Sequence, residues 1–341
     1  MFRGMKNIAT KFAKRWINKN VKNIVREICL SEGMIHENLK IEKIRKTGHE
    51  RKVISKVGET KYIFRISLKR SFKKDAEFHA LARKKGVPLS EAIAYGTKWI
   101  SVMPIKYMII EYVEGERCDD SYNLKKEEIK EIGKTFGKMH SIRKPKDGKK
   151  CVSMRKVAKI CRESYEHIKS ELNRKIENEG KEAVRWVLQS LSNMENELET
   201  RMVHGDPHGG NLIIGKKVNI IDTDSVHFGY ATLEMARCLL SNYNRLNVKR
   251  QKIFIDGYRT SIDEKIWNEW QNNTKLISVI SILRFAKDKV DFATRTGKKY
   301  RYEMALHFWK TFIKVSDKRE SQIGGIEDIM TLYDEAGKEV T

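Results

Sequence analysis

Two stretches of the first third of the chain show the alternation and composition of β-strands. Residues 51–57 (RKVISKV) and 61–67 (KYIFRIS) are rich in β-branched and aromatic side chains and flank a short GET turn. This arrangement predicts a β-hairpin. Residues 73–86 then show helical spacing and end at a glycine, which predicts one helix. The apolar run at 107–115 (YMIIEYVEG) predicts a buried strand.

The rest of the chain is mainly helical in pattern. From Leu124 onward, apolar residues recur at intervals of three and four, which is the spacing of one helical face. Short apolar runs at 211–215 and 218–222 interrupt this pattern and predict a second hairpin. We therefore predict an α+β protein in which a small β-rich lobe precedes a larger helical lobe.

These patterns predict that the chain has three parts. Residues 1–36 form a basic N-terminal segment, residues 37–117 the β-rich lobe and residues 118–341 the helical lobe. A charged and helical stretch near 142–200 interrupts the helical lobe as an insertion.

The N-terminal segment is amphipathic and strongly basic. Residues 1–26 contain eight Lys or Arg residues and no Asp or Glu. Their apolar residues fall at helical spacing: Phe2, Met5, Ile8, Ala9, Phe12, Ala13, Trp16 and Ile17. Such a helix either lies on an anionic membrane surface or packs its apolar face on the protein's own core. Both interpretations stay open at this point.

Composition narrows the class of protein. The chain has 341 residues, a hydrophobic fraction of 40% and a formal net charge of +24. The excess of positive charge favours an anionic partner: a nucleic acid, an anionic membrane surface, or a phosphorylated or carboxylated substrate. The five cysteines form no C-x-x-C pair, and the apolar runs are too short to span a membrane. These features predict a cytoplasmic protein in a reducing compartment.

The strongest chemical signal is VHGDPHGGNLII at 203–214, followed by VNIIDTD at 218–224. Asp206 and Asn211 lie five residues apart on a segment that one proline and two glycines keep from forming a regular helix. Asp222 ends the second strand of the predicted hairpin. Phosphoryl transfer needs a carboxylate that orients the attacking hydroxyl and oxygen ligands for magnesium, and these residues supply both.

The segment resembles the catalytic loop and metal-binding aspartate of the protein-kinase-like superfamily, in its lipopolysaccharide kinase and aminoglycoside phosphotransferase branch. The strand KYIFRIS, the run IEYVEG at 110–115 and KMH at 138–140 carry the resemblance further. Within that branch the nearest likeness is to lipopolysaccharide core heptose (II) kinases. The resemblance covers roughly 50–240 and implies a two-lobed kinase fold that uses ATP and Mg²⁺.

Residue roles follow from the matched positions. Asp206 is expected to be the catalytic base or hydroxyl-orienting carboxylate, and Asn211 and Asp222 the magnesium ligands. His204 is expected to brace the loop rather than carry protons. We assign no preferred role to His208.

The β-rich lobe departs from the usual kinase pattern. The strand position that normally holds a phosphate-binding lysine holds Arg65, and Glu77 on the following helix is its expected partner. Arginine can neutralise phosphate and grip a carboxylate with two hydrogen bonds, so the role can survive. Lys61 and Lys69 are alternative candidates. The chain has no G-x-G-x-x-G motif. The segment RKTGHERKV, where such a loop would be expected, contains the single glycine Gly48.

The segment IEYVEGE at 110–116 is the expected hinge. Backbone groups around Glu111 and Val113 could meet the adenine edge of the nucleotide, although the same pattern suits an ordinary core strand that ends in a turn.

The resulting prediction is an ATP-dependent phosphotransferase that acts on a sugar hydroxyl. The preferred acceptor is a heptose of the lipopolysaccharide core, a lipid-linked anionic glycan at the cytoplasmic face of the inner membrane. One alternative is a soluble kinase for small alcohols of the aminoglycoside or choline type. Another is a non-catalytic pseudokinase scaffold on an anionic membrane or nucleic acid, although a nucleic-acid partner is not expected.

Overall fold

The computed structural model describes residues 2–34, 38–47, 50–119, 123–145, 153–172, 177–194, 198–241, 247–317, 328 and 331, with side chains left aside at 2–14, 46–47, 172 and 177–179. The chain divides into two compact units. The first unit comprises Met1–Gly115 together with Asn219–Asp224, and the second comprises Glu116–Val218 and Ser225–Thr341. The sequence did not indicate that residues 219–224 return to the first unit.

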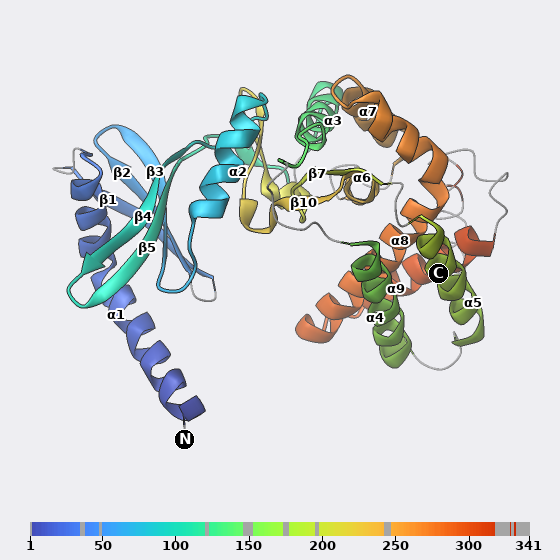
Figure 1. The fold of residues 1–341 in the computed structure, drawn as a ribbon, viewed down its shortest axis with the longest axis horizontal. Coiled ribbons are helices and arrows are strands. Elements are labelled where there is room, and N and C mark those ends of the chain that lie inside the picture. The colour runs from blue at the N-terminus through green and yellow to red at the C-terminus, as the bar shows by residue number, and fades with distance from the viewer. Residues whose placement is uncertain are drawn as a thin grey trace. The chain divides into compact units, whose positions relative to one another are not determined.

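A five-stranded antiparallel sheet forms the centre of the first unit, with strand order β1-β2-β3-β5-β4 (Figure 1). Two helices accompany it, α1 (Phe2–Ser31) and α2 (Lys73–Lys84). The strands are β1 (Lys40–Thr47), β2 (Glu50–Val57), β3 (Thr60–Ser67), β4 (Ala92–Ile100) and β5 (Met103–Glu111). The predicted hairpin is confirmed as β2 and β3, and Gly58 takes the positive φ of 59° that their tight turn requires.

One face of this sheet packs against α1. Phe64 and Ile66 of β3 are fully buried in a cluster with Ile24 and Ile28 of the helix. Trp16 and Ile17 pack into the same cluster. The apolar face of α1 from residue 16 onward is therefore covered by the protein's own core, while the apolar positions from Phe2 to Ala13 have side chains outside the described residues.

The opposite face of the sheet carries polar residues and meets α2. Because side chains alternate along a strand, Arg65 projects from β3 on the face opposite Phe64 and Ile66. Lys52 of β2 is the direct cross-strand neighbour of Arg65. Phe72 and Ala76 pack against Met108 on this same face. The sheet thus has an apolar face for α1 and a face that combines apolar packing with charge.

The second unit is mainly helical, and α8 is its longest helix (Figure 1). Its helices are α3 (Lys126–His140), α4 (Met154–Leu172), α5 (Glu177–Asn193), α6 (Ala231–Leu239), α7 (Val248–Arg259), α8 (Glu264–Thr296) and α9 (Tyr300–Asp317). The short strands β7 (Thr200–Val203) and β10 (His227–Tyr230) pair with each other. Strands β6 (Glu116–Arg117) and β8 (Leu212–Ile214) also pair with each other, and β9 (Val218–Ile220) begins at the last residue before the chain re-enters the first unit.

Helices α3 and α7 of this unit pack closely against each other. The two helices approach so closely at Gly133 and Gly257 that a Cβ on Gly257 would lie 2.0 Å from the carbonyl oxygen of Lys130.

The stretch predicted as an insertion, 142–200, contains α4 and α5, which pack against α8 and α9. Among the described residues, no helix has the length and apolar character needed to cross a membrane.

Candidate active site

The loop after β7 holds the predicted catalytic residues of the second unit. It runs from His204 through a short 3-10 turn at Gly209–Asn211 and enters β8. Gly205 has a φ of +83°, and a Cβ there would lie 2.5 Å from the carbonyl oxygen of Ser225. Glycine is therefore required at this bend by both backbone conformation and space.

Glu234 of α6 is the anchor of this loop. Its Oε2 accepts hydrogen bonds from the His204 N–H at 2.7 Å and from His140 Nε2 at 2.9 Å, and its Oε1 accepts one from the Gly205 N–H at 2.6 Å. His140 in turn bonds Tyr258 Oη through Nδ1, at 2.8 Å. Burial raises the pKa of Glu234, but the His140 hydrogen bond and the neighbouring positive charge outweigh it and lower that pKa to about 2. A buried carboxylate thus fixes two successive backbone amides of the loop.

Asp206 projects from the braced loop with half of its side chain exposed. Its Oδ2 lies 3.4 Å from His208 Nε2, and its Oδ1 lies 3.9 Å from an Arg237 guanidinium nitrogen. The hydrogen bond from His208 lowers the pKa of Asp206 most strongly; burial opposes this, and the charges of Arg237 and His204 add to the lowering. Asp206 is consequently an ionised carboxylate at neutral pH.

Asn211 is held beside Asp206 and is itself buried. Its Nδ2 donates to the Asp206 carbonyl oxygen at 3.0 Å and approaches Asp206 Oδ2 at 3.4 Å. Because the amide nitrogen is engaged in this way, Oδ1 is the side-chain atom that could ligate a cation. His204 is fully buried, and its Nδ1 accepts from the Asp206 N–H at 3.2 Å. The structure brings these three sequence-predicted residues together.

Asp222 lies in the first unit and faces the charged side of the sheet. It has a φ of +58°, a left-handed conformation that few residues other than glycine adopt and that aspartate tolerates better than most. Lys52 Nζ donates to Asp222 Oδ1 at 2.9 Å and lies 3.5 Å from Asp224 Oδ2. Thr223 between them bonds His79 of α2 at 2.7 Å. The segment 222–224 is thus tied to β2 and α2.

Arg65 is the centre of a buried charge network. Its guanidinium bonds both carboxylate oxygens of Glu50, at 2.5 and 3.0 Å, and lies 3.3 Å from Asp75 Oδ2. It also forms an ion pair with Asp224. Burial raises the pKa of Asp224, but the positive charges of Arg65, Lys52 and Arg70 outweigh burial and lower that pKa overall.

The expected partner of Arg65 on α2 is therefore corrected. Glu77 has 59% of its side chain exposed and lies 4.0 Å from Lys73, whereas Asp75 meets Arg65. Two residues along an α-helix correspond to a rotation of about 200°. Because the side chain of Asp75 faces Arg65, the side chain of Glu77 points to the other side of the helix. The fallback residue Lys61 pairs with Glu42 at 3.3 Å, away from this network.

The predicted hinge lies at the end of β5. The Glu111 N–H donates to the Glu91 carbonyl oxygen at 2.9 Å. Val113 follows the strand by two residues and is half-buried. Tyr112 between them donates its N–H to the Lys61 carbonyl oxygen at 3.2 Å.

Sequence reasoning missed Lys52, Glu234 and Arg237. The cross-strand position of Lys52 opposite Arg65 follows from the predicted hairpin register, so alternation along β2 could have found it. No local pattern marks Glu234, which lies 30 residues after His204 in the sequence. Arg237 follows Glu234 by one helical turn on α6, and could have been found once Glu234 was.

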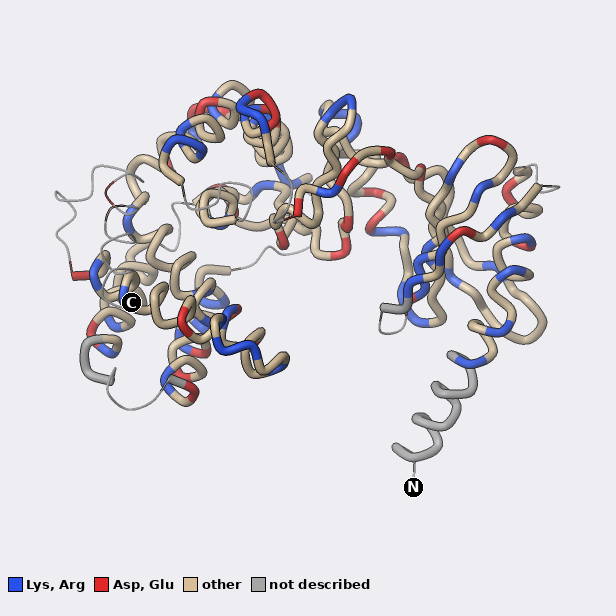
Figure 2. Tube along the Cα trace, turned by 180° about the vertical axis from the view of Figure 1, so that it is seen from behind, with Lys and Arg blue, Asp and Glu red and all other residues tan. Residues whose placement is uncertain are grey.

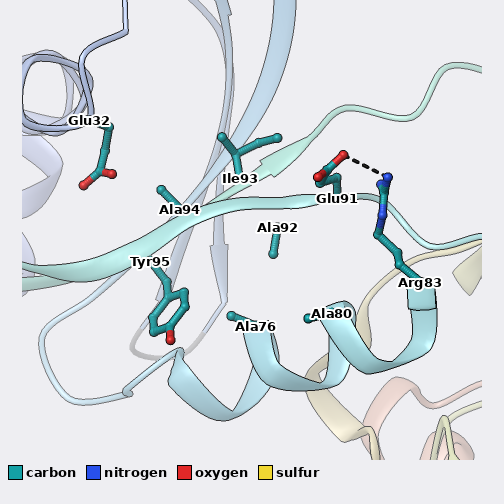
Figure 3. Close-up of a pocket in the computed structure, with 9 residues that line it drawn as sticks. All are labelled: Glu32, Ala76, Ala80, Arg83, Glu91, Ala92, Ile93, Ala94 and Tyr95. Atoms are coloured by element: carbon teal, nitrogen blue, oxygen red, sulfur yellow. Dashed lines mark ion pairs between the residues drawn. The ribbon is translucent and has the colours of Figure 1, made fainter. Parts of the chain in front are cut away.

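A cavity of about 500 Å³ in the first unit lies between α2 and β4 (Figure 3). Figure 3 shows Ala76 and Ala80 facing it from the helix, with Tyr95 on the strand and the Arg83–Glu91 ion pair at one end. It contains none of the predicted site residues. A smaller cavity of about 210 Å³ adjoins the Asp206 loop in the second unit, with Gly205, Glu234 and Arg237 in its wall.

These features define a phosphotransferase of the kinase type, and the comparisons with known proteins agree. The chain matches the phosphotransferase enzyme family over residues 40–270, more than half of its length, and it belongs to that family. The predictions of an enzyme and of a phosphotransferase are thereby confirmed. A sequence comparison with curated proteins finds no match.

Solved structures with the same kinase-like fold include three small-molecule kinases. Spectinomycin phosphotransferase in complex with ADP and spectinomycin is 12% identical, with 91% of this chain and 95% of that chain covered and a TM-score of 0.52. Plasmodium vivax ethanolamine kinase is 14% identical, with 91% and 94% covered and a TM-score of 0.54. Choline kinase from Cryptosporidium parvum is 15% identical, with 93% and 96% covered and a TM-score of 0.53. The predicted α+β kinase-like fold is confirmed.

Proposed function

We propose that this enzyme transfers the γ-phosphoryl group of ATP to a sugar hydroxyl, with Asp206 as the catalytic base. The observation that carries the proposal is the Asp206 loop: an ionised, half-exposed carboxylate on a backbone fixed by the buried Glu234. In the reaction the acceptor oxygen bonds to the γ-phosphorus while the bond to the β,γ-bridging oxygen breaks. ADP leaves, and Asp206 takes the proton of the acceptor hydroxyl.

Asn211 and Asp222 are the residues proposed to hold Mg²⁺. Both offer the hard oxygen ligands that Mg²⁺ prefers. Because the amide nitrogen of Asn211 already donates to Asp206, its Oδ1 is the atom proposed to bind the cation. Magnesium, when bound, neutralises the phosphate charge that develops during transfer. The left-handed backbone at Asp222 is the kind of local strain that functional sites retain.

Lys52 is proposed to bind the nucleotide phosphates in place of the strand lysine of other kinases. Its side chain is 19% exposed and its ammonium already pairs with Asp222 and Asp224, whereas the Arg65 side chain is 3% exposed and held by three carboxylates. Arg65 is enclosed by carboxylates and therefore positions them, whereas Lys52 lies at the edge of the network and can reach the phosphates. Arg65 therefore acts mainly as the organiser of Glu50, Asp75 and Asp224.

Backbone groups at Glu111 and Val113 are proposed to meet the adenine edge. The Glu111 N–H is used in a hydrogen bond to Glu91, so the Glu111 carbonyl and the backbone of Val113 are the groups proposed to face the nucleotide. The nucleotide assignment has further support from the solved structures, since the spectinomycin phosphotransferase was crystallised with ADP.

For the acceptor, we propose a heptose of the lipopolysaccharide core, bound by an enzyme working at the cytoplasmic face of the membrane. Supporting this are the net charge of +24 and the distribution of Lys and Arg along the elements of both units (Figure 2). The second candidate is a small-molecule alcohol, because the kinases with this fold act on spectinomycin, choline and ethanolamine according to their names.

Label transfer from γ-labelled ATP with Mg²⁺ tests these assignments. One reaction contains phosphate-deficient lipopolysaccharide and a second contains a pool of aminoglycosides and amino alcohols. We expect label in the lipopolysaccharide and none with Asp206→Asn. Label in the small-molecule pool alone would reject the heptose acceptor and retain the phosphotransferase, and equal transfer by Asp206→Asn would reject the role of Asp206.

A further inference from the structure

The smaller cavity of the second unit has a strongly cationic wall. It has a volume of about 210 Å³ and is enclosed by α4, α6, α8 and the segments around β7 and β10. Lys156 of α4, Arg237 of α6 and Arg284 of α8 line it, together with one carboxylate, Glu234. We call it the cationic cavity. Three cations from three different helices converge on this space.

The carboxylate in the wall already accepts three hydrogen bonds. Both Glu234 oxygens accept hydrogen bonds, from His140, His204 and Gly205, as described above. In the described part of the chain, neither Arg284 nor Lys156 forms a direct ion pair with Glu234, although its charge acts on Arg284 at longer range. Among the described residues, neither the Lys156 ammonium nor the Arg284 guanidinium forms a hydrogen bond or ion pair.

The surroundings of Arg284 disfavour the charged form of its guanidinium group. Burial lowers the pKa of Arg284 most, and the charge of Arg237 lowers it further, while Asp288 one turn along α8, Cys161 and Glu234 oppose this. Asp288 does not line the cavity. Arg237 also has a buried Nε without a hydrogen-bond partner in the described part of the chain. Like charges that approach one another beside a cavity are stabilised when an anion enters it.

Arg237 connects the cationic cavity to the catalytic loop. One guanidinium nitrogen donates to the Gly205 carbonyl oxygen at 2.7 Å, and another lies 3.9 Å from Asp206 Oδ1. A group bound in the cavity is therefore one side chain away from the proposed base. Val157, Ile160 and Leu233 supply an apolar part of the wall, which suits the carbon skeleton of a sugar.

We infer that the cationic cavity binds a phosphate group carried by the acceptor, and that this phosphate anchors a neighbouring hydroxyl beside Asp206. The inference rests on the proposed phosphotransferase function and adds the substrate class, a phosphorylated alcohol. A phosphate carries about −1.5 to −2 charge at pH 7 and several acceptor oxygens, which suits a wall with three cations and one carboxylate. The same wall repels ammonium groups, so cationic acceptors of the aminoglycoside type are disfavoured at this site.

Calorimetric titration with matched ligand pairs tests the inference. The nucleotide site is first filled with AMP-PNP and Mg²⁺, so that added phosphates do not bind to Lys52. Glucose 1-phosphate is compared with glucose, and a phosphorylated lipopolysaccharide core oligosaccharide with its dephosphorylated form. We expect at least one phosphorylated ligand to bind about 10-fold or more tightly than its neutral twin, as charge-assisted hydrogen bonds allow.

Variants locate that binding. Arg284→Gln and Lys156→Gln should each weaken binding of the phosphorylated ligand about 10-fold. The matched controls are Lys287→Gln on α8 and Lys159→Gln on α4, whose side chains pair with Asp291 and Glu163 and do not line the cavity. They should leave the dissociation constant unchanged. Lys156 is exposed, so its variant remains informative if Arg284→Gln fails to fold.

The outcomes separate this inference from the proposed function. Preference for glucose 1-phosphate indicates a free sugar phosphate, and preference for the phosphorylated core indicates the lipid-linked glycan; either supports the inference. Equal binding of every pair, or unchanged binding in both cavity variants, overturns it. ATP turnover by the wild type is measured separately: its absence rejects the proposed function, while the binding comparison still reports on the cavity.

Discussion

Replacing Glu234 with glutamine removes the charge that anchors the catalytic loop while keeping the shape of the side chain. In the wild type, Glu234 accepts from the His204 and Gly205 amides and from His140. Glutamine offers one oxygen, so its NH₂ group must face at least one of these donors. The Glu234 side chain is 4% exposed, and water cannot take over the lost bonds.

Two routes give a similar magnitude for Glu234→Gln. Hydrogen bonds to charged groups contribute about 1.5–3 kcal/mol each, and at least one is lost with a buried donor left unpaired. The same contacts lower the pKa of Glu234 from 4.5 to about 2, which corresponds to about 3 kcal/mol in favour of the folded state. We therefore expect the free energy of unfolding to fall by about 3 kcal/mol at pH 7.

Urea unfolding as a function of pH provides the assay. Because the pKa of Glu234 is depressed in the folded state, its contribution is complete above the unfolded value of 4.5 and is lost as the pH falls towards 2. The wild type and Glu234→Gln should converge at low pH. The control, Glu163→Gln, removes an exposed α4 pair and should cost at most about 0.5 kcal/mol. A loss below about 1 kcal/mol at pH 7, or a gap independent of pH, would refute the reasoning.

Three further predictions concern the nucleotide cation, the loop glycine and a buried acid. Lys52→Ala should raise the KM for ATP about 10-fold or more, because its ammonium is the cation proposed for the phosphates; Lys56→Ala, which loses an exposed pair with Glu59, should not. Gly205→Ala should lower kcat about 100-fold in steady-state assays with the fold retained by circular dichroism, since its Cβ would displace the loop. Burial raises the pKa of Glu269 to about 7, so stability falls as pH rises from 4.5 through 7; Glu269→Gln should therefore melt higher than the wild type at pH 8 and alike at pH 4.

Local sequence patterns predicted the elements and the loop of this enzyme. The alternation in 51–67 defined the β2–β3 hairpin, and the GDPHGGN segment identified Asp206 and Asn211 as neighbours on one loop. These features depend on residues close together in the chain. The helical pattern of the N-terminal segment was also correct, and the structure adds that its apolar face from Trp16 onward belongs to the core.

Partners from distant parts of the sequence could not be predicted in the same way. Asp75 and Glu77 are equally acidic and two residues apart, and the rotation of α2 against the sheet decides that Asp75 meets Arg65. Glu234 is fixed by tertiary packing of α6, which leaves no periodic signal. The cationic cavity collects side chains from α4, α6 and α8, so its charge appears only when those helices are packed together.

The central claim is that Asp206 acts as the base of a phosphotransferase. The most direct measurement is the rate of γ-phosphoryl release or transfer from labelled ATP by the wild type, by Asp206→Asn and by Asp256→Asn, an exposed control on α7. The account predicts that Asp206→Asn loses at least 100-fold in rate while it still binds AMP-PNP, and that Asp256→Asn matches the wild type. Wild-type turnover by Asp206→Asn would contradict it.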